Sequence, residues 1–240
     1  MNQHDRHMVG TAGSEDALLG IGLYAIPEAA RLLQTSSQRL RRWLAGYGAV
    51  GPNGDRQYPG LWESDVVLDD GARFLSFRDL MEMRVATRFA VAGVRLDTLR
   101  KCHDRATQVL GTDRPFSDER FSTDGRTIFL EEPDVDEDTA LLDLLSGQWI
   151  FRRFLAPTFV DVEHHQGRPV RWWALDRKRS VILDPARSFG QPIVVDSGVP
   201  TAVLAEAATV EGSVRRAAKL YEVAEHEVRD AVLFEERMAA

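Results

Sequence analysis

The segment 29–47 has the residues to bind nucleic acid, because it carries four arginines and no acidic residue. Three of those arginines and a glutamine fall within positions 38–42, where a helix would turn them away from its apolar side. Guanidinium groups contact phosphates and pair bidentately with guanine in the major groove. The residues predicted to face bases are Gln38, Arg41 and Arg42, and those predicted to lie nearer phosphates are Ser37 and Arg39.

Two short helices joined by a tight turn are expected to position these side chains. Pro27 suits a first helical position, where its missing N–H costs nothing. The polar cluster 34–36 ends that helix, and Ser36 is a good N-cap for the next one. The apolar face of the second helix is predicted to consist of Leu40, Trp43, Leu44 and Tyr47. The pattern predicts a helix-turn-helix, and the alternative is an arginine-rich helix face that contacts only solvent.

A turn-rich stretch, "GPNGDRQYPGLWESD", follows the second helix and predicts a small wing or loop beside it. Arg56 and Tyr58 are the residues of this stretch expected to contact the DNA backbone. The alternative is an ordinary loop whose tyrosine packs inward.

A second segment, 217–235, repeats the same helical rhythm with the opposite charge. Its "AAKLYEVAEHEVRDAV" begins, like "AARLLQTSSQRLRRWL", with two alanines, a cation and a leucine. It holds two cations and five acids, a count of −3, where segment 29–47 counts +4. Carboxylates at a phosphate surface would repel. This segment is therefore predicted to contact protein rather than DNA.

Composition excludes several classes of protein. A net charge of −7 argues against a chain that coats nucleic acid through bulk charge. No apolar run approaches the roughly 18 residues that span a bilayer, and residues 1–19 lack a secretory signal pattern. A flexible N-terminal arm and a cytoplasmic location are therefore expected. The single cysteine, Cys102, excludes an internal disulfide framework and a cysteine-rich zinc site.

Catalytic and metal sites are not predicted. His164 and His165 lie in a predicted hairpin, where neighbouring side chains face opposite sides of the strand and do not easily share one metal. The acidic run 131–138 lacks the spacing of a calcium-binding loop. Neither a Walker-type phosphate loop nor a GxSxG motif occurs. No catalytic residue, metal or cofactor is expected, and the chain is not expected to be an enzyme.

The whole chain predicts an α+β fold that is helical, then β-rich, then helical. An apolar helical stripe over 80–110 is interrupted at Gly93, hairpins are expected at Asp124-Gly125 and near Gln166-Gly167, and short strands at "SVILD" and "PIVV". Three helices are expected over 201–210, 213–221 and about 225–238. The predicted parts are an arm at 1–19, a winged helix-turn-helix domain at 20–112, a central β-rich region at 113–178 and a C-terminal three-helix, helix-turn-helix-like module at 179–240.

Two stretches resemble known protein families. "YAIPEAARLLQTSSQRLRRWL", with "RQYP" and the long helical segment after it, resembles the DNA-binding domain of MerR-type regulators over about 20–110. "FGQPIVVDSGVPT" and the three helices after it resemble the DUF433 family over about 179–238. The combination, with "FSTDGRTIFLE" between them, is similar to VapB-type antitoxins of bacterial toxin–antitoxin pairs.

This resemblance implies a type II antitoxin that binds and inhibits a PIN-like ribonuclease toxin and represses its own operon by binding operator DNA. Arg41 and Arg42 carry over from the helix-turn-helix pattern. Ala224 stands where the second copy would carry a capping serine or threonine. The resemblance also implies a homodimer, and residues proposed for dimerisation or toxin binding are Arg229, Phe234 and Arg237.

The chain departs from MerR-type regulators in its expected dimer contact, and a second function is an alternative to the antitoxin. MerR-type regulators dimerise through a long helix directly after the DNA-binding domain, and here Gly111 to Pro115 interrupts that helix, so a dimer contact is expected elsewhere. The alternative function is a stand-alone MerR-like transcriptional regulator that senses a small ligand through its central region. Trp149, Trp172 and Trp173 would line such a pocket, or they pack in the core.

Overall fold

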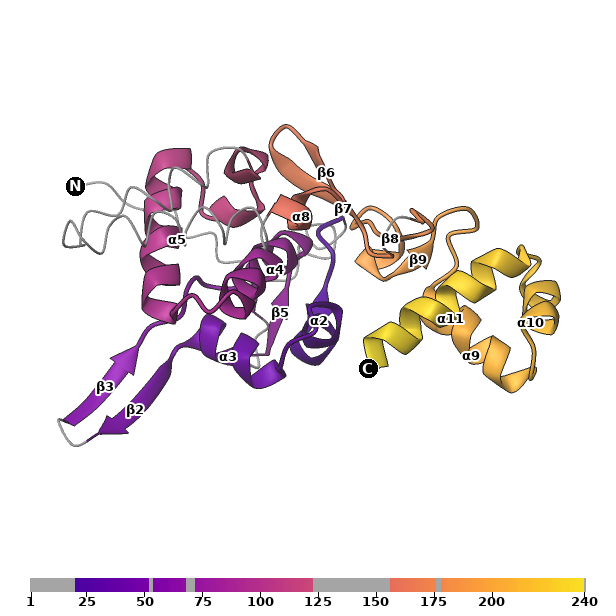
Figure 1. The fold of residues 1–240 in the computed structure, drawn as a ribbon, viewed down its shortest axis with the longest axis horizontal. Helices are drawn as coiled ribbons and strands as arrows, with labels where there is room; N and C mark the ends of the chain where they lie inside the picture. The colour runs from indigo at the N-terminus through magenta and orange to yellow at the C-terminus, as the bar shows by residue number, and fades with distance from the viewer. Residues whose placement is uncertain (1–19, 52–53, 68–71, 123–155, 176–177, 240) are drawn as a thin grey trace, which may run out of the picture.

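The computed structural model describes residues 20–51, 54–67, 72–122, 156–175 and 178–239 (Figure 1). Within these residues the chain is a mixed α+β protein whose paired strands are all antiparallel. The expected arm at 1–19, the hairpin at Asp124-Gly125, the acidic run 131–138 and Trp149 lie outside the described residues. In the described ranges, no helix has the length and apolar character that crossing a bilayer requires.

Short strands and two short helices open the described chain. Their bounds are β1 Tyr24–Ala25, α2 Ile26–Leu32, α3 Ser37–Ala45, β2 Tyr47–Gly51, β3 Gly54–Tyr58, β4 Val66–Val67 and β5 Arg73–Leu75. One sheet has the strand order β1-β5-β4, and β2 and β3 form a separate hairpin. Figure 1 shows this hairpin projecting from the body of the molecule next to the end of α3.

Two long helices follow, with bounds α4 Phe77–Val91 and α5 Leu96–Leu110, and a short 3-10 helix, η1, spans Pro115–Ser117. A capping box begins α4, because the Asp79 N–H donates to the Ser76 Oγ and the Ser76 N–H donates to the Asp79 carboxylate. Gly93, at φ +87°, lies between the two helices, so the predicted break is confirmed.

Helix α4 is the central helix of this part of the fold, and it is buried on nearly every side. Phe89 of α4 lies 5.5 Å, ring centre to ring centre, from Phe116, which lies 4.8 Å from Phe121. All three rings are fully buried. Charged residues on the same helix, Glu82 and Arg84 among them, are buried as well and are paired.

A four-stranded antiparallel sheet, of strand order β6-β7-β8-β9, lies beside this helical body. Its elements, with the short helix α8 before them, are α8 Ala156–Phe159, β6 Val162–His165, β7 Arg168–Trp173, β8 Val181–Leu183 and β9 Ile193–Val194, and η3 Ser188–Gly190 lies between β8 and β9. The predicted turn at Gln166-Gly167 is confirmed, since both residues have positive φ. The predicted boundary at residue 178 falls between β7 and β8, which pair in this one sheet.

Three helices complete the chain, α9 Thr201–Val210, α10 Val214–Tyr221 and α11 Glu225–Ala239. All three were expected, and Ser213 caps α10 by accepting from the Arg216 N–H. α11 packs on α9 and α10 and also contacts β8, β9 and α2, so the C-terminal helices lie against both the sheet and the N-terminal part (Figure 1).

A buried ion pair joins α4 to the four-stranded sheet. Both carboxylate oxygens of Asp161 lie 2.8 Å from Nη2 of Arg84, and Nη1 of the same arginine donates to the carbonyl of Thr158. The guanidinium also lies over the ring of Trp172, 4.6 Å from its centre. These contacts fix the four-stranded sheet to α4.

Candidate nucleic-acid interface

Helix α3 is amphipathic, and its apolar side is inside the protein. Leu40, Trp43 and Leu44 are at most 5% exposed. Ser36 caps the helix by accepting from the Arg39 N–H at 3.2 Å, as predicted. The first turn contains no acidic residue. The polar side of α3 therefore faces solvent with no carboxylate near its N-terminus.

The predicted base-facing and phosphate-facing residues of α3 lie together on that exposed side. Four of them are exposed and Ser37 is half-buried. Arg39 donates to the Thr35 hydroxyl at 3.3 Å, which holds it near the turn. Within the described chain, Gln38 and Arg41 make no side-chain hydrogen bond or ion pair. Their polar groups are free to meet a ligand.

Arg42 differs from its neighbours because it contacts the hairpin. Its guanidinium lies over the ring of Tyr47, 5.5 Å from the ring centre, and Tyr47 stacks on Tyr58 at 4.8 Å and 17°. The prediction that Tyr47 extends the apolar face of the helix is wrong, because the helix ends at Ala45 and Tyr47 begins β2. Tyr58 is half-buried in this ring stack.

Two glycines hold the hairpin against the end of α3. At Gly46, with φ +72°, a Cβ would lie 2.2 Å from the Tyr58 carbonyl oxygen, and at Gly60 it would lie 2.4 Å from that of Leu44. Arg100 of α5 donates to the carbonyl of Pro59 at 2.9 Å. The backbone at the base of the hairpin is thus packed directly against the backbone at the end of α3. In the sequence, the two glycines on either side of the stretch 47–58 indicate this close packing.

The other predicted wing residue, Arg56, lies in β3, where its backbone pairs with Ala49. The placement of its side chain falls outside what the structure describes. A contact between Arg56 and DNA remains a prediction.

A buried polar network lies beneath α3 and the hairpin, and it was not anticipated. Asp79 accepts from Trp62 Nε1 at 3.1 Å and from Arg114 Nε at 2.7 Å, and Arg114 also pairs with Asp65 at 2.7 Å. Burial raises the pKa of Asp79, and the charge of Arg114 opposes that rise. The network ties α4 to the residues directly before β4 and η1.

The C-terminal residues proposed for a partner contact have three different placements. Arg229 is exposed and forms an ion pair with Glu225 one turn earlier, at 2.5 Å. Phe234 is 1% exposed and packs in the core, so its side chain offers no surface to a partner and the prediction for it does not hold. Arg237 is half-buried.

The acidic residues of segment 217–235 do not form one uniform surface. Glu227 is only 6% exposed and accepts from the backbone N–H groups of Ala224 and Ser197, both at 3.0 Å. It therefore supplies part of the cap that Ala224 cannot. Asp230, also 6% exposed, pairs with Lys178 at 2.6 Å. Both carboxylates are structural.

Helix α10 presents cations that the segment count missed, because two of them precede residue 217. The exposed cations of this helix are Arg215, Arg216 and Lys219. They lie on the face opposite the buried Ala217 and Ala218. The C-terminal helices thus combine a basic helix with the acidic start of α11.

Trp172, Trp173 and His164 of the central sheet make structural contacts. Trp172 is 4% exposed and donates to Asp161 at 3.1 Å, and Trp173 donates to Glu163 at 2.7 Å. His164 Nε2 lies 3.3 Å from the Ser117 carbonyl oxygen, and His165 is exposed. Among the described residues, no group of three or more histidine, cysteine or acidic side chains is placed to hold a metal ion.

A solved structure shares this fold. The crystal structure of the protein Rv2018 from Mycobacterium tuberculosis matches with a TM-score of 0.66 and 20% identity, over 89% of this chain and 99% of that chain. At that identity the likeness concerns the fold alone. No protein-family model matches the sequence, and no match is found among curated proteins.

Proposed function

We propose that this chain is the antitoxin of a type II toxin–antitoxin pair, which represses its own operon and neutralises a PIN-like ribonuclease toxin. In this proposal α2 and α3 act as a helix-turn-helix on operator DNA, with the β2–β3 hairpin as its wing. The observation that carries the DNA-binding half is the exposed face of α3, where Gln38 and Arg41 have no partner in the described chain. The toxin-binding half rests on the resemblance to VapB-type antitoxins.

The dimensions of α3 suit the major groove. Its nine residues make a helix about 14 Å long at roughly 1.5 Å per residue, and the groove is about 12 Å wide. With the apolar side against the body, Gln38 and Arg41 would reach base edges and Arg39 a phosphate. The hairpin, fixed to the helix by the Arg42–Tyr47 contact, would lie along the adjacent backbone.

The local charge favours this surface although the whole chain is acidic. Segment 29–47 has a count of +4 while the chain has a net charge of −7, and three of its arginines, Arg39, Arg41 and Arg42, form an exposed cationic patch on α3. Phosphate contacts made by such a patch release counterions, and the affinity for DNA would fall as salt rises. A net negative charge elsewhere would limit non-specific binding.

The C-terminal helices would bind the toxin. The exposed cations of α10 and the exposed Arg229 face outward from this part of the chain. A PIN-like ribonuclease has an acidic, metal-binding centre, which cationic side chains complement. A homodimer would place two helix-turn-helix units on the two half-sites of an operator. The protein would act in the cytoplasm.

The test is to express the tagged chain together with the genes beside it and to purify the tag. We expect a small PIN-like protein to co-purify in fixed stoichiometry and the complex to shift the DNA upstream of the gene pair. A chain that purifies alone and still shifts this DNA would refute the antitoxin half and leave a DNA-binding regulator. A complex that binds no DNA would refute the repressor half.

A further inference from the structure

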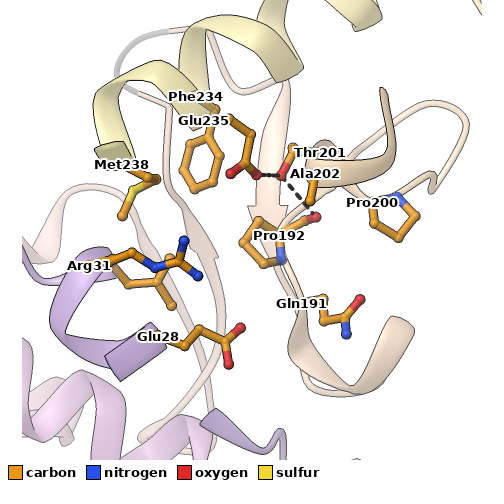
Figure 2. A pocket seen from close by; sticks show the side chains of 11 residues that line it. Glu28, Arg31, Gln191, Pro192, Pro200, Thr201, Ala202, Phe234, Glu235 and Met238 are labelled. Atoms are coloured by element: carbon orange, nitrogen blue, oxygen red, sulfur yellow. Dashed lines mark hydrogen bonds between the residues drawn. The ribbon is translucent and has the colours of Figure 1, made fainter. Parts of the chain in front are cut away.

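A cavity of about 180 Å³ lies where α2 faces the C-terminal helices (Figure 2). Helix α2, the segment before and after β9, and helices α9 and α11 supply its walls. No residue of α3 lines it, and of its lining residues Phe234 alone was predicted from the sequence to contact a partner. Its lining includes Glu28, Arg31, Leu32, Phe234, Glu235 and Met238.

Three charged side chains line this cavity. Figure 2 shows the carboxylates of Glu28 and Glu235 and the guanidinium of Arg31 turned toward the same space. Within the described chain the Arg31 side chain makes no hydrogen bond or ion pair, so it neutralises neither carboxylate by direct contact. Glu235 accepts from the Thr201 hydroxyl at 2.5 Å, which fixes its position. The cavity thus has two carboxylates and one guanidinium that are not paired with one another.

Charge repulsion acts between the two carboxylates. Burial raises the pKa of Glu28, a backbone hydrogen bond and Arg31 oppose the rise, and the negative charge of Glu235 adds to it. A cation placed between the carboxylates would remove this repulsion and gain two charge-assisted hydrogen bonds. The charges therefore favour a positively charged guest over a negatively charged one.

The rest of the lining is apolar. The apolar residues that line the cavity are Leu32, Phe234, Met238, Pro192 and Pro200. A short hydrocarbon chain would cover the exposed parts of Met238, Pro192 and Pro200, which are all half-buried. We propose that the cavity binds a small organic cation, an alkylammonium with a short apolar chain, whose ammonium group is held by Glu28 and Glu235. A carboxylate at the far end of such a molecule would meet Arg31.

Three probes of equal chain length test this assignment by titration calorimetry on the full-length protein without DNA. They are hexylammonium, 6-aminohexanoate and hexanoate, which carry a cation, both charges and an anion. We expect the first two to bind and hexanoate to bind at least about tenfold more weakly. Hexanoate binding as tightly as hexylammonium, or the absence of binding by all three probes, would overturn the proposal.

Substitutions then locate the bound cation. Glu28→Gln and Glu235→Gln keep the side-chain shape and should each weaken hexylammonium binding about tenfold. Glu236→Gln, an exposed neighbour on the same helix that does not line the cavity, is the matched control and should leave binding unchanged. Arg31→Met should weaken 6-aminohexanoate and spare hexylammonium. Equal effects of Glu235→Gln and Glu236→Gln would place the bound cation elsewhere and refute the assignment. Because no DNA is present, this result is independent of the proposed repressor function.

Discussion

The guanidinium of Arg42 lies 5.5 Å from the centre of the Tyr47 ring, which joins the last turn of α3 to the first residue of β2. Tyr47 in turn stacks on Tyr58 at the other end of the hairpin. The three side chains form one column along the base of the hairpin. Arg42 is therefore a positioning residue for the hairpin in this conformation, while Gln38 and Arg41 remain free.

Replacing Tyr47 by alanine should loosen the hairpin without disrupting the core. The substitution removes a cation–π contact and a ring stack, together about 1–2 kcal/mol, from a half-buried site. We expect operator affinity to fall about tenfold in a gel-shift titration, and the free energy of unfolding in urea to fall by no more than about 2 kcal/mol. Tyr47→Phe keeps both ring contacts and should bind normally. Equal losses in the two variants would mean that the hydroxyl, and not the stack, matters.

Replacing Arg41 by alanine should weaken operator binding and leave folding unchanged. We expect a loss of about 1–3 kcal/mol for one base contact, because Arg41 is exposed and has no partner in the described chain that would be left unpaired. Arg168 is an exposed arginine on β7, in the four-stranded sheet, so Arg168→Ala is the matched control. The measurement is fluorescence anisotropy with operator DNA. Similar losses in both variants would indicate a purely bulk-charge effect and exclude α3 as the reading helix.

Removing a phosphate contact has a different signature from removing a base contact. Arg39 lies in the first turn of α3, and its guanidinium donates to the hydroxyl of Thr35 in the turn before the helix. If Arg39 contacts a phosphate, Arg39→Ala should reduce the slope of log affinity against log salt by about 0.9. Arg41→Ala should alter that slope less and alter preference among operator sequences more. Anisotropy titrations over a range of salt concentrations measure both quantities, and an unchanged slope for Arg39→Ala would contradict the assignment.

Local signals explain which elements were predictable from sequence. Ser36 marks the start of α3, Gly93 marks the break between α4 and α5, and Ser213 marks the start of α10. Each of these residues acts through hydrogen bonds or backbone angles within a few positions, so the local sequence is enough to predict the helix boundary. The exposed face of α3 was predictable for the same reason. Its apolar residues recur at helical spacing and are buried, which places Gln38 on the opposite, exposed side.

Contacts between distant segments explain the rest. Arg84 and Asp161 are 77 positions apart, and Tyr24 donates to the carbonyl of Gly190 across 166 positions, so no local pattern indicates either contact. Tyr47 was misplaced because helical spacing continues past Gly46, while the positive φ of Gly46 ends the helix there. Phe234 illustrates a similar limit: its helix is amphipathic, but only the fold shows which side lies against α9 and the sheet.

The cations of α10 provide a test of toxin binding that spares DNA binding. Arg215 and Arg216 are exposed and lie on a helix far from α3 in the sequence. On the proposed function, Arg215→Glu with Arg216→Glu should abolish co-purification of the toxin while operator binding by the antitoxin alone stays intact. The control for added negative charge is Arg105→Glu, at an exposed position on α5. Retained toxin binding in the double variant would show that the toxin does not bind through these cations of α10.

The buried partner of Arg114 should matter far more to stability than its exposed one. Asp79 is fully buried and Asp113 is 65% exposed at its side chain, yet both contact the same guanidinium. Asp79→Ala leaves a buried charge short of a partner and should cost about 3–5 kcal/mol. Asp113→Ala should cost less than about 1 kcal/mol. Urea unfolding measures both free energies, and similar costs would show that the network is not sealed from water.

Protonation of Glu227 should contribute to the acid sensitivity of the C-terminal helices. Burial would raise its pKa, but hydrogen bonds from Ala224 and Ser197 outweigh that effect and hold the pKa below 4.5. A carboxyl group whose pKa is lower in the folded state than in the unfolded state adds stability above pH 4.5, and this stability is lost as pH falls through the folded-state pKa. Glu227→Gln should therefore lower the free energy of unfolding at pH 7, by about 1 kcal/mol, and should cost less at pH 3.

The control for this pH dependence is Glu225→Gln. Glu225 lies in the same first turn of α11, but its side chain is 44% exposed and pairs only with the exposed Arg229 among the described contacts. Its removal should cost little at either pH. Urea midpoints of the two variants and the parent chain at pH 7 and pH 3 give the comparison. A Glu227→Gln penalty that stays constant between these pH values would mean that the charge of the carboxylate contributes nothing and would contradict the prediction.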